Sequence, residues 1–368
     1  MGLLGLSGCG SPSSASVEMS SQTELVKTGS MELQYAENFT VDYYEDGYKM
    51  LTTLPDSKRY LIVPEGQPVP QGLDEDVSIL QEPLQNIYLV ASGAMDMFAS
   101  LDAVDQIRFS GQKQENWYIQ TAKDAMAAGD MIYAGKYSKP DYELLVSEGC
   151  DLAIENRMIT HSPEVVEMLQ SFDIPVMIEY SSYEQHPLGK VEWVKFFGAL
   201  TGKEAKAEEA FAEQTEILEE VESGEKTGKT IAFFYVTSNG LIQVRQSTDY
   251  IPKLIELAGG RYIFENLEDS GSGRSTLNMQ VEDFYAGARD ADILIYNSSI
   301  DGGVTTVDEL IGKCNILKDF KAVQEGQVYC TTNDMYQQSM AVGYLLQDMH
   351  TVLTDDDTAK LRYLFLLQ

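Results

Sequence analysis

The sequence predicts an α/β protein with two α/β lobes, each built on a central sheet, joined by a single long α-helix, and with a small β-rich segment near the N-terminus. Three observations lead to this prediction. Two series of short apolar runs alternate with helical stretches, one series in each half of the chain, which is typical of parallel sheets covered on both faces. A long segment of helical periodicity lies between them. A group of β-branched and aromatic runs precedes the first series.

The β-rich segment covers residues 31–72. The runs FTVDYY, YKMLTTL and RYLIV are separated by EDG and PDSK, which are turn sequences, so we expect a small antiparallel sheet. The stretch PEGQPVPQG at 64–72 follows, and its three prolines end the strand pattern.

The N-terminal lobe is expected over residues 31–189 and the C-terminal lobe over residues 228–368. Each contains four apolar runs that read as buried strands. Those of the first lobe are IYLVAS (87–92), MIYAG (131–135), CDLAIE (150–155) and IPVMIEY (174–180). Those of the second lobe are TIAFFYVTS (230–238), RYIF (261–264), ADILIYNSS (291–299) and QVYCTT (327–332). The repetition of the series predicts two similar lobes.

Residues 190–227 are expected to form the interlobe helix. Its apolar residues keep one face before Thr201–Gly202 and another face after this interruption. They are Trp193, Phe196, Phe197 and Leu200, and then Ala207, Ala210, Phe211, Leu218 and Val221. The second part, 203–222, would span about 30 Å at 1.5 Å per residue. One rigid helix of this length could join both lobes.

The composition excludes several classes of partner. The chain has 368 residues, enough for two or three domains. Its 26 Lys and Arg face 58 Asp and Glu, a formal charge of −32, which repels nucleic acid and bare anionic membranes. No stretch approaches the roughly 20 apolar residues of a membrane-spanning helix. We therefore expect no nucleic-acid partner.

Three of the four cysteines, Cys150, Cys314 and Cys330, are widely spaced, form no CxxC and lie in apolar or strand-like surroundings. A buried free thiol is the ordinary reading of such a position, so we expect no disulfide and no metal there. Among the three histidines, His161 and His186 raise the possibility of metal or haem ligation. None has paired metal-ligand spacing, so we expect no metal site and no cofactor.

The common enzyme signatures are absent from the sequence. The stretch GEKTGKT at 224–230 resembles a phosphate-binding loop, but the motif needs glycine where Ser223 stands, and this stretch follows a helix and opens a strand. Neither G-x-S-x-G nor H-E-x-x-H occurs. We expect no catalytic residues, and a hydrolase or transferase of unknown signature is the enzymatic alternative.

Residues 1–30 are expected to be a truncated signal followed by a flexible tether. MGLLGLSG is apolar but lacks a positively charged region, and residues 10–30 are rich in Ser, Thr and Gly. N-myristoylation requires Ser or Thr at the sixth position, where Leu6 stands. Leu6-Ser7-Gly8-Cys9 resembles a bacterial lipobox, which predicts that Cys9 is lipidated. The alternative is a disordered N-terminus with an accidental cysteine.

Four further stretches extend this resemblance to most of the chain. They are KPDYELLVSEGCDLAIENRM (139–158), HPLGKVEWVKFFGALTGKEAKAEEAF (186–211), DYIPKLIELAGGRYIF (249–264) and VEDFYAGARDADILIYNS (281–298). In order and spacing they resemble the substrate-binding lipoproteins of ABC importers, in the ferric-siderophore and cobalamin group of periplasmic binding proteins. The resemblance covers roughly residues 84–350. It implies the class III fold, with ligand held between two lobes that close only modestly.

The resemblance also implies a function. The chain would be a monomeric extracytoplasmic solute-binding protein, lipid-anchored at the outer face of the cytoplasmic membrane, that delivers an iron complex to an ABC permease. A ferric siderophore is the leading ligand, with haem, cobalamin or another chelate as alternatives. A sensory or structural envelope protein that lost transport is a further alternative.

Docking to the permease is expected to use one glutamate from each lobe. Family members present such residues ahead of a strand, and Glu143 and Glu282 occupy the matching positions before DLAI and DILI. Exposed carboxylates on two rigid bodies can pair bidentately with arginines. The alternative for each is an ordinary solvated carboxylate.

Ligand contacts are expected from the residues that follow the apolar runs, because open α/β sheets bind ligands at the carboxyl ends of their strands. In the first lobe these are Ser92, Met95, Tyr133, Arg157, His161 and Tyr183. In the second lobe they are Asn239, Arg245 and Asn297. Aromatic faces with arginines suit a large, flat or anionic complex. Individually, Tyr133 also fits a packing role and Arg245 a surface ion pair.

Overall fold

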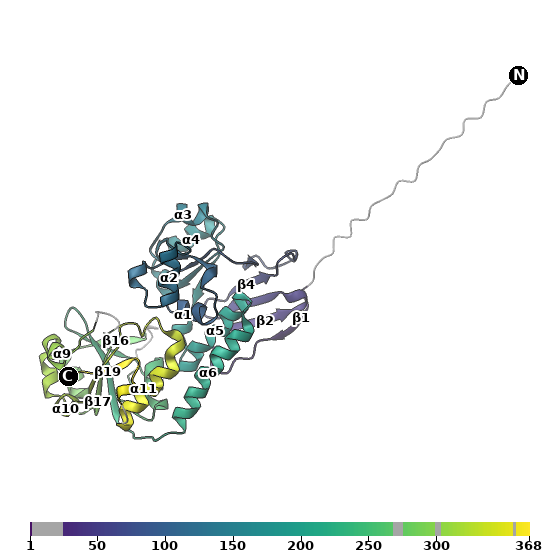
Figure 1. Cartoon of the computed structure of the whole chain (residues 1–368). Helices are drawn as coiled ribbons and strands as arrows, with labels where there is room; N and C mark the ends of the chain where they lie inside the picture. Colours follow the sequence, from purple (N-terminus) through teal and green to yellow (C-terminus); the bar gives the residue numbers. More distant parts are fainter. Residues whose placement is uncertain (2–24, 268–274, 299–302, 356–357) are drawn as a thin grey trace.

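The computed structural model describes residue 1 and residues 25–267, 275–298, 303–355 and 358–368. Figure 1 shows two lobes, with α5 and α6 beside their junction and a separate small sheet at the N-terminal side. Cys9 lies outside the described residues. Within these ranges, no helix combines the length and the apolar character needed to cross a membrane.

The N-terminal sheet has five strands in the order β1-β2-β3-β4-β5. Their bounds are β1 Lys27–Ser30, β2 Phe39–Tyr44, β3 Lys49–Thr53, β4 Lys58–Val63 and β5 Val77–Gln81. The first four pair antiparallel, which confirms the predicted hairpins, whereas β5 pairs parallel with β4. The sheet therefore continues beyond residue 72, because the proline-rich stretch is a crossover between β4 and β5.

The sheet of the N-terminal lobe is parallel throughout, in the order β12-β11-β6-β7-β8. Its strands are β6 Ile87–Leu89, β7 Ile107–Ser110, β8 Ile132–Tyr133, β11 Leu152–Asn156 and β12 Val176–Glu179. A two-stranded ribbon, β9 Gly135–Lys136 and β10 Lys139–Pro140, follows β8. Leu152 and Ile154 pack in one core and Ala153 in another. This burial on both faces confirms the prediction from the apolar runs.

The helices of this lobe are α1 Ala94–Ser100, α2 Gln120–Ala128, α3 Tyr142–Ser147 and α4 Pro163–Ser171. Short 3₁₀ turns are η1 Glu45–Gly47, η2 Val104–Gln106, η3 Gln114–Asn116, η4 Arg157–His161 and η5 Ser181–Tyr183. The strand β7 was not predicted, because its run IRFS contains Arg and Ser and is not a continuous apolar run.

The segment between the lobes forms two helices, α5 (Pro187–Thr201) and α6 (Glu204–Glu222). Gly202 has φ +67°, a left-handed conformation that ends α5 at the interruption seen in the sequence. A Cβ on Gly198 would lie 2.6 Å from that of Ala207, and Lys195 pairs with Glu208 at 3.0 Å. These contacts show an antiparallel helical hairpin. Residues 190–227 are thus two helices rather than one, and α6 is the long helix that leads into the second lobe.

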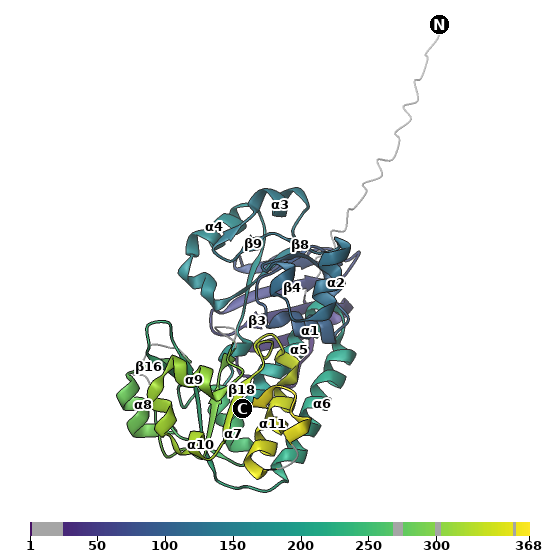
Figure 2. The same ribbon diagram turned by 60° about the vertical axis from the view of Figure 1, so that its left-hand side comes forward.

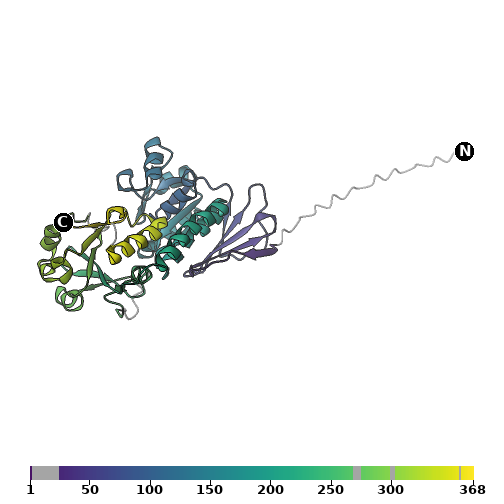
Figure 3. The same cartoon turned by 60° about the horizontal axis from the view of Figure 1, so that its bottom comes forward.

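Helix α5 is buried on all sides, from Pro187 to Leu200. Trp193, Phe196 and Phe197 pack with Phe39 of the N-terminal sheet and Phe98 of α1. Figure 3 shows the purple N-terminal sheet at one end of the molecule, with the teal helices next to it. The sequence predicted one apolar face for α5, whereas the structure covers its polar positions as well.

The C-terminal lobe has a mixed sheet in the order β16-β14-β13-β17-β18-β19, with β15 also paired to β13. The strands are β13 Thr230–Val236, β14 Ile242–Arg245, β15 Arg261–Tyr262, β16 Thr276–Met279, β17 Ile293–Tyr296, β18 Val328–Thr331 and β19 Leu364–Leu366. Strands β13, β15, β17 and β18 run parallel, as predicted from their apolar runs. Strands β14, β16 and β19 are antiparallel and were not predicted.

The helices of this lobe are α7 Tyr250–Leu257, α8 Val281–Ala288, α9 Val307–Lys313, α10 Lys321–Gln324 and α11 Val342–Thr354, with 3₁₀ turns η7 Asn315–Asp319, η8 Ser339–Ala341 and η9 Thr358–Lys360. Figure 2 shows α5, α6 and α11 along one side of the lobe junction. Cys150, Cys314 and Cys330 are buried free thiols, as predicted, and burial raises the pKa of Cys150 to about 12.

Candidate ligand-binding site between the lobes

Four of the predicted ligand residues lie at one edge of the N-terminal lobe. Ser92 follows β6, Tyr133 ends β8, Arg157 follows β11 and Tyr183 follows β12. The strands are parallel, so their carboxyl ends share this edge. The side chains of Tyr133 and Tyr183 are about two-fifths exposed, at 41% and 39%.

Arg157 and Tyr183 come together, as a ligand site would need. The guanidinium carbon of Arg157 lies 4.6 Å from the centroid of the Tyr183 ring, a cation–π arrangement. Asn156 caps the 3₁₀ turn η4, because its side chain accepts a hydrogen bond from the backbone N–H of Met158. The cap fixes the start of the turn that carries Arg157. The pair offers a cation and a flat aromatic surface at the edge of the sheet.

The other two residues expected at this edge differ in exposure. Met95 is completely buried in α1 and packs in the main hydrophobic core, because its position in the helix faces inward. It is therefore not available to a ligand in this structure. His161 is exposed at the end of η4.

The candidate residues of the C-terminal lobe are less exposed than expected. Asn239 lies in the exposed turn after β13, and its Oδ1 accepts a hydrogen bond from the Thr237 hydroxyl at 2.6 Å. Asn297 follows β17 but is only 3% exposed, and its backbone N–H donates to the carbonyl of Phe234. Of these two, Asn239 is the residue with an accessible side chain.

Arg245 was expected in a loop after the first strand of this lobe, and that placement is wrong. It is the last residue of β14, a strand that returns antiparallel to β13. Its guanidinium lies 3.5 Å from Asp249 and 5.7 Å from the ring of Phe233. Burial raises the pKa of Asp249, and the charge of Arg245 offsets part of this rise. Arg245 is held inside its own lobe.

Two exposed tyrosines that the sequence reading missed meet across the lobe junction. Tyr118 follows β7 and Tyr336 follows β18, with exposures of 44% and 39%. Their ring centroids are 6.2 Å apart in an edge-to-face arrangement. Tyr118 was missed because β7 was not predicted. Tyr336 was within reach of the sequence, since it lies five residues after Thr331, where β18 ends.

A hydrogen bond between the lobes lies beside these tyrosines. The backbone N–H of Tyr118 donates to Oε1 of Gln337 at 2.8 Å. The loops at the carboxyl ends of β7 and β18 are thus in direct contact. This contact brings the Tyr118 loop of the N-terminal lobe and the Tyr336 loop of the C-terminal lobe together.

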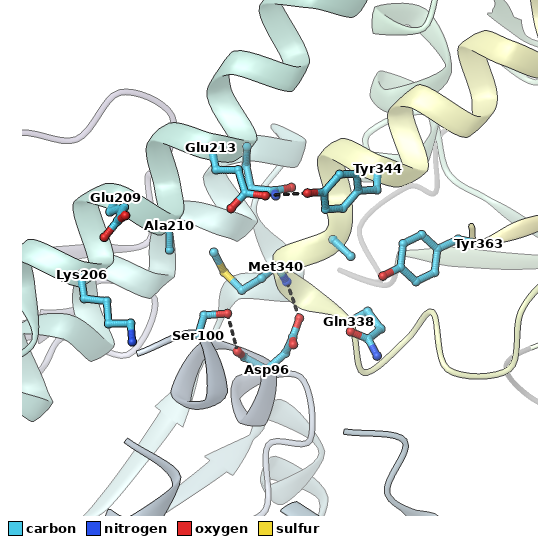
Figure 4. A pocket seen from close by; sticks show the side chains of 12 residues that line it. Asp96, Ser100, Lys206, Glu209, Ala210, Glu213, Gln338, Met340, Tyr344 and Tyr363 are labelled. Atoms are coloured by element: carbon cyan, nitrogen blue, oxygen red, sulfur yellow. Dashed lines mark hydrogen bonds between the residues drawn. The ribbon is translucent and has the colours of Figure 1, made fainter. Parts of the chain in front are cut away.

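A separate cavity of about 570 Å³ lies between α1, α6 and the start of α11 (Figure 4). None of the nine predicted ligand residues lines it. In Figure 4, Asp96 on α1 accepts a hydrogen bond from the backbone N–H of Met340, and the Tyr344 hydroxyl donates to Glu213. Burial raises the pKa of Asp96 to about 6, although the Met340 N–H and the Lys190 charge lower it. This cavity belongs to the lobe junction.

His186 lines a second cavity, of about 360 Å³, with Tyr35 and Lys253. Its ring stacks on Tyr35 at 4.4 Å, and Nδ1 accepts a hydrogen bond from the backbone N–H of Leu188 at the start of α5. Burial and the Lys253 charge lower its pKa. His186 is therefore a neutral helix cap. Across the described ranges, no three His, Cys, Asp or Glu side chains are grouped as metal ligands.

The two glutamates expected to dock the permease have equivalent positions. Glu143 lies in the first turn of α3, before β11, and Glu282 lies in the first turn of α8, before β17. Both are exposed. A carboxylate in the first turn of a helix is favoured by the helix dipole. This local preference explains their positions without a partner, so docking stays a prediction.

Curated relatives of this chain are found in an archaeon. An uncharacterized lipoprotein of Methanocaldococcus jannaschii is 23% identical over 351 residues, which covers 87% of this chain and 81% of the relative.

Solved structures show the same fold. The periplasmic heme-binding protein of Vibrio cholerae matches with a TM-score of 0.58 at 14% identity, over 73% of this chain and 98% of that one. The petrobactin-binding protein of Bacillus subtilis matches with a TM-score of 0.57 at 14% identity, over 73% of this chain and 92% of that one. These likenesses support the predicted two-lobe class III architecture.

The sequence profile of one family matches residues 91–335, two-thirds of the chain. The matched region starts in the loop after β6 and ends beyond β18, so it includes most of both lobes and both helices between them. The N-terminal sheet precedes it. The chain belongs to the periplasmic binding protein family.

Proposed function

We propose that this protein is the extracytoplasmic solute-binding component of an ABC importer, and that it captures an iron chelate, a ferric siderophore first, between its lobes. The observation that carries the proposal is the meeting of the carboxyl-edge loops of both lobes at Tyr118 and Tyr336. The family match and the petrobactin and heme binding stated in the names of structural neighbours support it.

The chemistry of the site favours a flat or anionic ligand. Arg157 and Tyr183 offer a charge and a ring in contact, and Tyr133, Tyr118 and Tyr336 add exposed aromatic surface. Aromatic rings contribute large contact area with little loss of rotamer freedom on binding. Arginine binds carboxylate, hydroxamate and catecholate oxygens through several N–H groups at once.

Fluorescence titration of the purified chain tests the proposal. Trp117 is buried directly beside Tyr118, and its indole N–H donates to Ser110 at 3.0 Å, so it lies close to a bound ligand. The panel contains ferric catecholate and ferric hydroxamate siderophores, haem and cobalamin. Saturable quenching by a ferric siderophore below about a micromolar, near −8 kcal/mol, is the expected result. A flat response to the whole panel would contradict the proposal.

Variants of the arginine–tyrosine pair locate the site. Arg157→Ala is expected to weaken binding on the order of tenfold or more, because it removes a hydrogen-bonded charge. Arg289→Ala is the matched control, since Arg289 also lies over a tyrosine, Tyr285, at 5.6 Å, but at the C-terminal end of α8 in the other lobe. Equal affinity in wild type and Arg157→Ala would show that the ligand does not bind at this edge of the sheet.

Docking to a permease is proposed for Glu143 and Glu282. Glu143→Lys and Glu282→Lys are expected to abolish most uptake in cells while the affinity for ligand stays unchanged. Glu164→Lys and Asp308→Lys are matched controls, because both are exposed carboxylates in the first turn of a helix. Lost ligand binding in Glu143→Lys or Glu282→Lys would overturn the docking role.

A lipid anchor on Cys9 is proposed from the lipobox-like sequence and from the lipoprotein names of two archaeal relatives. One acyl chain holds a protein only marginally, so stable anchoring needs more than one chain. Mass spectrometry of the mature N-terminus is expected to show a lipidated Cys9. Recovery of an unmodified N-terminus from membranes would contradict it.

Haem is the second candidate ligand, because one structural neighbour is a heme-binding protein and the exposed tyrosines suit a flat macrocycle. Quenching by haem alone in the same panel would select this alternative. Cobalamin is distinguished in the same way.

A further inference from the structure

Gln337 joins the two lobes through its side-chain amide. It is completely buried in the loop after β18. Its Nε2 donates to the carbonyl of Asn116 at 2.8 Å, and its Oε1 accepts from the N–H of Tyr118 at 2.8 Å. Both partners belong to the backbone of the N-terminal lobe. One amide thus satisfies a donor and an acceptor on the opposite lobe, as a neighbouring strand would.

A second contact follows three residues later. The N–H of Met340 donates to Oδ2 of Asp96 on α1 at 2.7 Å. The approach is close there, since a Cβ on Gly93 would lie 3.0 Å from the hydroxyl oxygen of Ser339. The N–H of Gly343 then donates to Oε1 of Gln214 on α6 at 2.9 Å. The chain from 337 to 343 is therefore tied to the first lobe and to the interlobe helix.

We propose that Gln337 and Asp96 form an interlobe clasp that fixes the spacing of the lobes. Both act as positioning residues for the ligand site, because the clasp holds Tyr118 and Tyr336 facing one another. The positioning role rests on the proposed function, whereas the spacing of the lobes does not. Gln337 is buried and Asp96 is half-buried at the cavity of Figure 4, and each pairs with backbone groups, so loss of either contact leaves a polar group unpaired. When the lobes open, water can form hydrogen bonds with that unpaired group. A variant without the contact is therefore expected to have a larger population of open conformations.

The alanine variants of Asp96 and Gln337 leave different backbone groups unpaired. Gln337→Ala frees the Tyr118 N–H, and Asp96→Ala frees the Met340 N–H. Asp96→Asn keeps a side-chain oxygen that can accept from Met340 and is the conservative variant. Gln81→Ala is the matched control for glutamine, because Gln81 donates to the carbonyls of Val63 and Pro64 within the N-terminal sheet alone.

Distances between the lobes test the clasp without any ligand. Spin labels are placed on cysteines at Glu164 and Asp308, which are exposed on different lobes. Cys9 is replaced by serine, and the buried cysteines stay. For the double variant Gln337→Ala/Asp96→Ala we expect a broader distribution of distances between the two labels. Its mean should exceed the wild-type mean by more than the width of the wild-type distribution. Asp96→Asn and Gln81→Ala are expected to keep the wild-type distribution. An unchanged distribution in the folded double variant would overturn the clasp.

Hydrogen exchange of single variants gives a second measurement if the double variant does not fold. The Tyr118 amide is expected to exchange on the order of tenfold faster in Gln337→Ala. The Met340 amide should do so in Asp96→Ala and keep its protection in Asp96→Asn. Wild-type rates at both amides in the alanine variants would overturn the clasp.

The same proteins, titrated with the ferric siderophores, separate the two proposals. Lobes that open in the double variant while wild type binds no chelate support the clasp and count against the proposed function. Binding by wild type with no opening of the double variant overturns the clasp and leaves the function in place. When both hold, the double variant is expected to release the chelate at least about tenfold faster.

Discussion

Two completely buried glutamates, one on α5 and one on β11, have opposite surroundings. Glu192 of α5 accepts hydrogen bonds from the backbone N–H groups of Gln34, Tyr35 and Ala36, at 2.8 to 3.1 Å. It also lies 3.5 Å from Lys195. Every donor comes from the segment that precedes β2. The buried Glu192 carboxyl group therefore holds the N-terminal sheet against the helical hairpin through these N–H groups.

Glu155 of β11 has none of these partners. Both carboxyl oxygens are buried without a hydrogen bond, and burial raises its pKa to about 8. It is therefore mostly protonated at pH 7. The comparison teaches that burial alone does not decide what a carboxyl group does. Donors aimed at Glu192 make it a structural tie between two segments, whereas Glu155, without donors, ties nothing.

Glu184 extends the first case. It accepts from the N–H groups of Glu37 and Asn38 and from the indole N–H of Trp193. Together the two carboxylates bind five consecutive backbone amides, 34–38. This explains how a sheet outside the family match stays attached to the family fold.

The largest effect is expected from Glu192→Ala. The variant leaves three backbone N–H groups unpaired and removes a partner of the buried Lys195. Breaking a buried pair typically costs 3–5 kcal/mol, so we expect a loss of about 4 kcal/mol. The free energy of unfolding in urea measures it. Glu216→Ala, on the exposed face of α6, is the control. A loss below about 1 kcal/mol in Glu192→Ala would show that the sheet is held by its apolar contacts.

The opposite sign is expected from Glu155→Gln. Because its folded pKa is raised from 4.5 to about 8, Glu155 contributes full stability below pH 4.5, which is lost as pH rises through about 8. The variant should therefore gain on the order of 2 kcal/mol at pH 7, and this gain should shrink toward pH 4.5. Unfolding curves of both proteins across this range measure it. A gain independent of pH would contradict a titrating Glu155.

The smallest effect is expected from Gly198→Ala, in the same hairpin as Glu192. The added Cβ would lie 2.6 Å from that of Ala207, so the helices must separate. Strain outweighs the better helix propensity, and we expect a net loss of about 1 kcal/mol. Gly312→Ala is the control, since no atom lies within 4 Å of its added Cβ. Thermal unfolding midpoints should move in opposite directions, and a shared direction would show that the hairpin yields freely.

Much of the fold was readable from local sequence patterns. The apolar runs identified all four parallel strands of the second lobe, since β-branched and aromatic runs bounded by turns are typical of buried strands. The short strands β7 and β14 escaped, because their runs IRFS and IQVR contain polar residues and are not continuous apolar runs. That error placed Arg245 in a loop and hid Tyr118.

The candidate site was less predictable than the fold. Reading the residues after each strand found the Arg157–Tyr183 pair, because parallel strands bring their carboxyl ends to one edge. The same rule selected Met95, but the packing of α1 buries that side chain in the core. Whether a side chain is buried depends on how its helix packs against other elements. The order of residues along the chain does not reveal that packing.

The sequence by itself determined the two α/β lobes, the N-terminal hairpins, the break at Gly202 and the buried free thiols. Each follows from a pattern within a few residues. Only the tertiary structure decided that Lys190, Glu192 and Lys195 are buried on α5, and that Gln337 bonds to Tyr118, 219 residues away. Such contacts depend on which distant part of the chain packs against a helix or loop. Local periodicity shows only that one face of a helix is apolar, and it does not show which element covers that face.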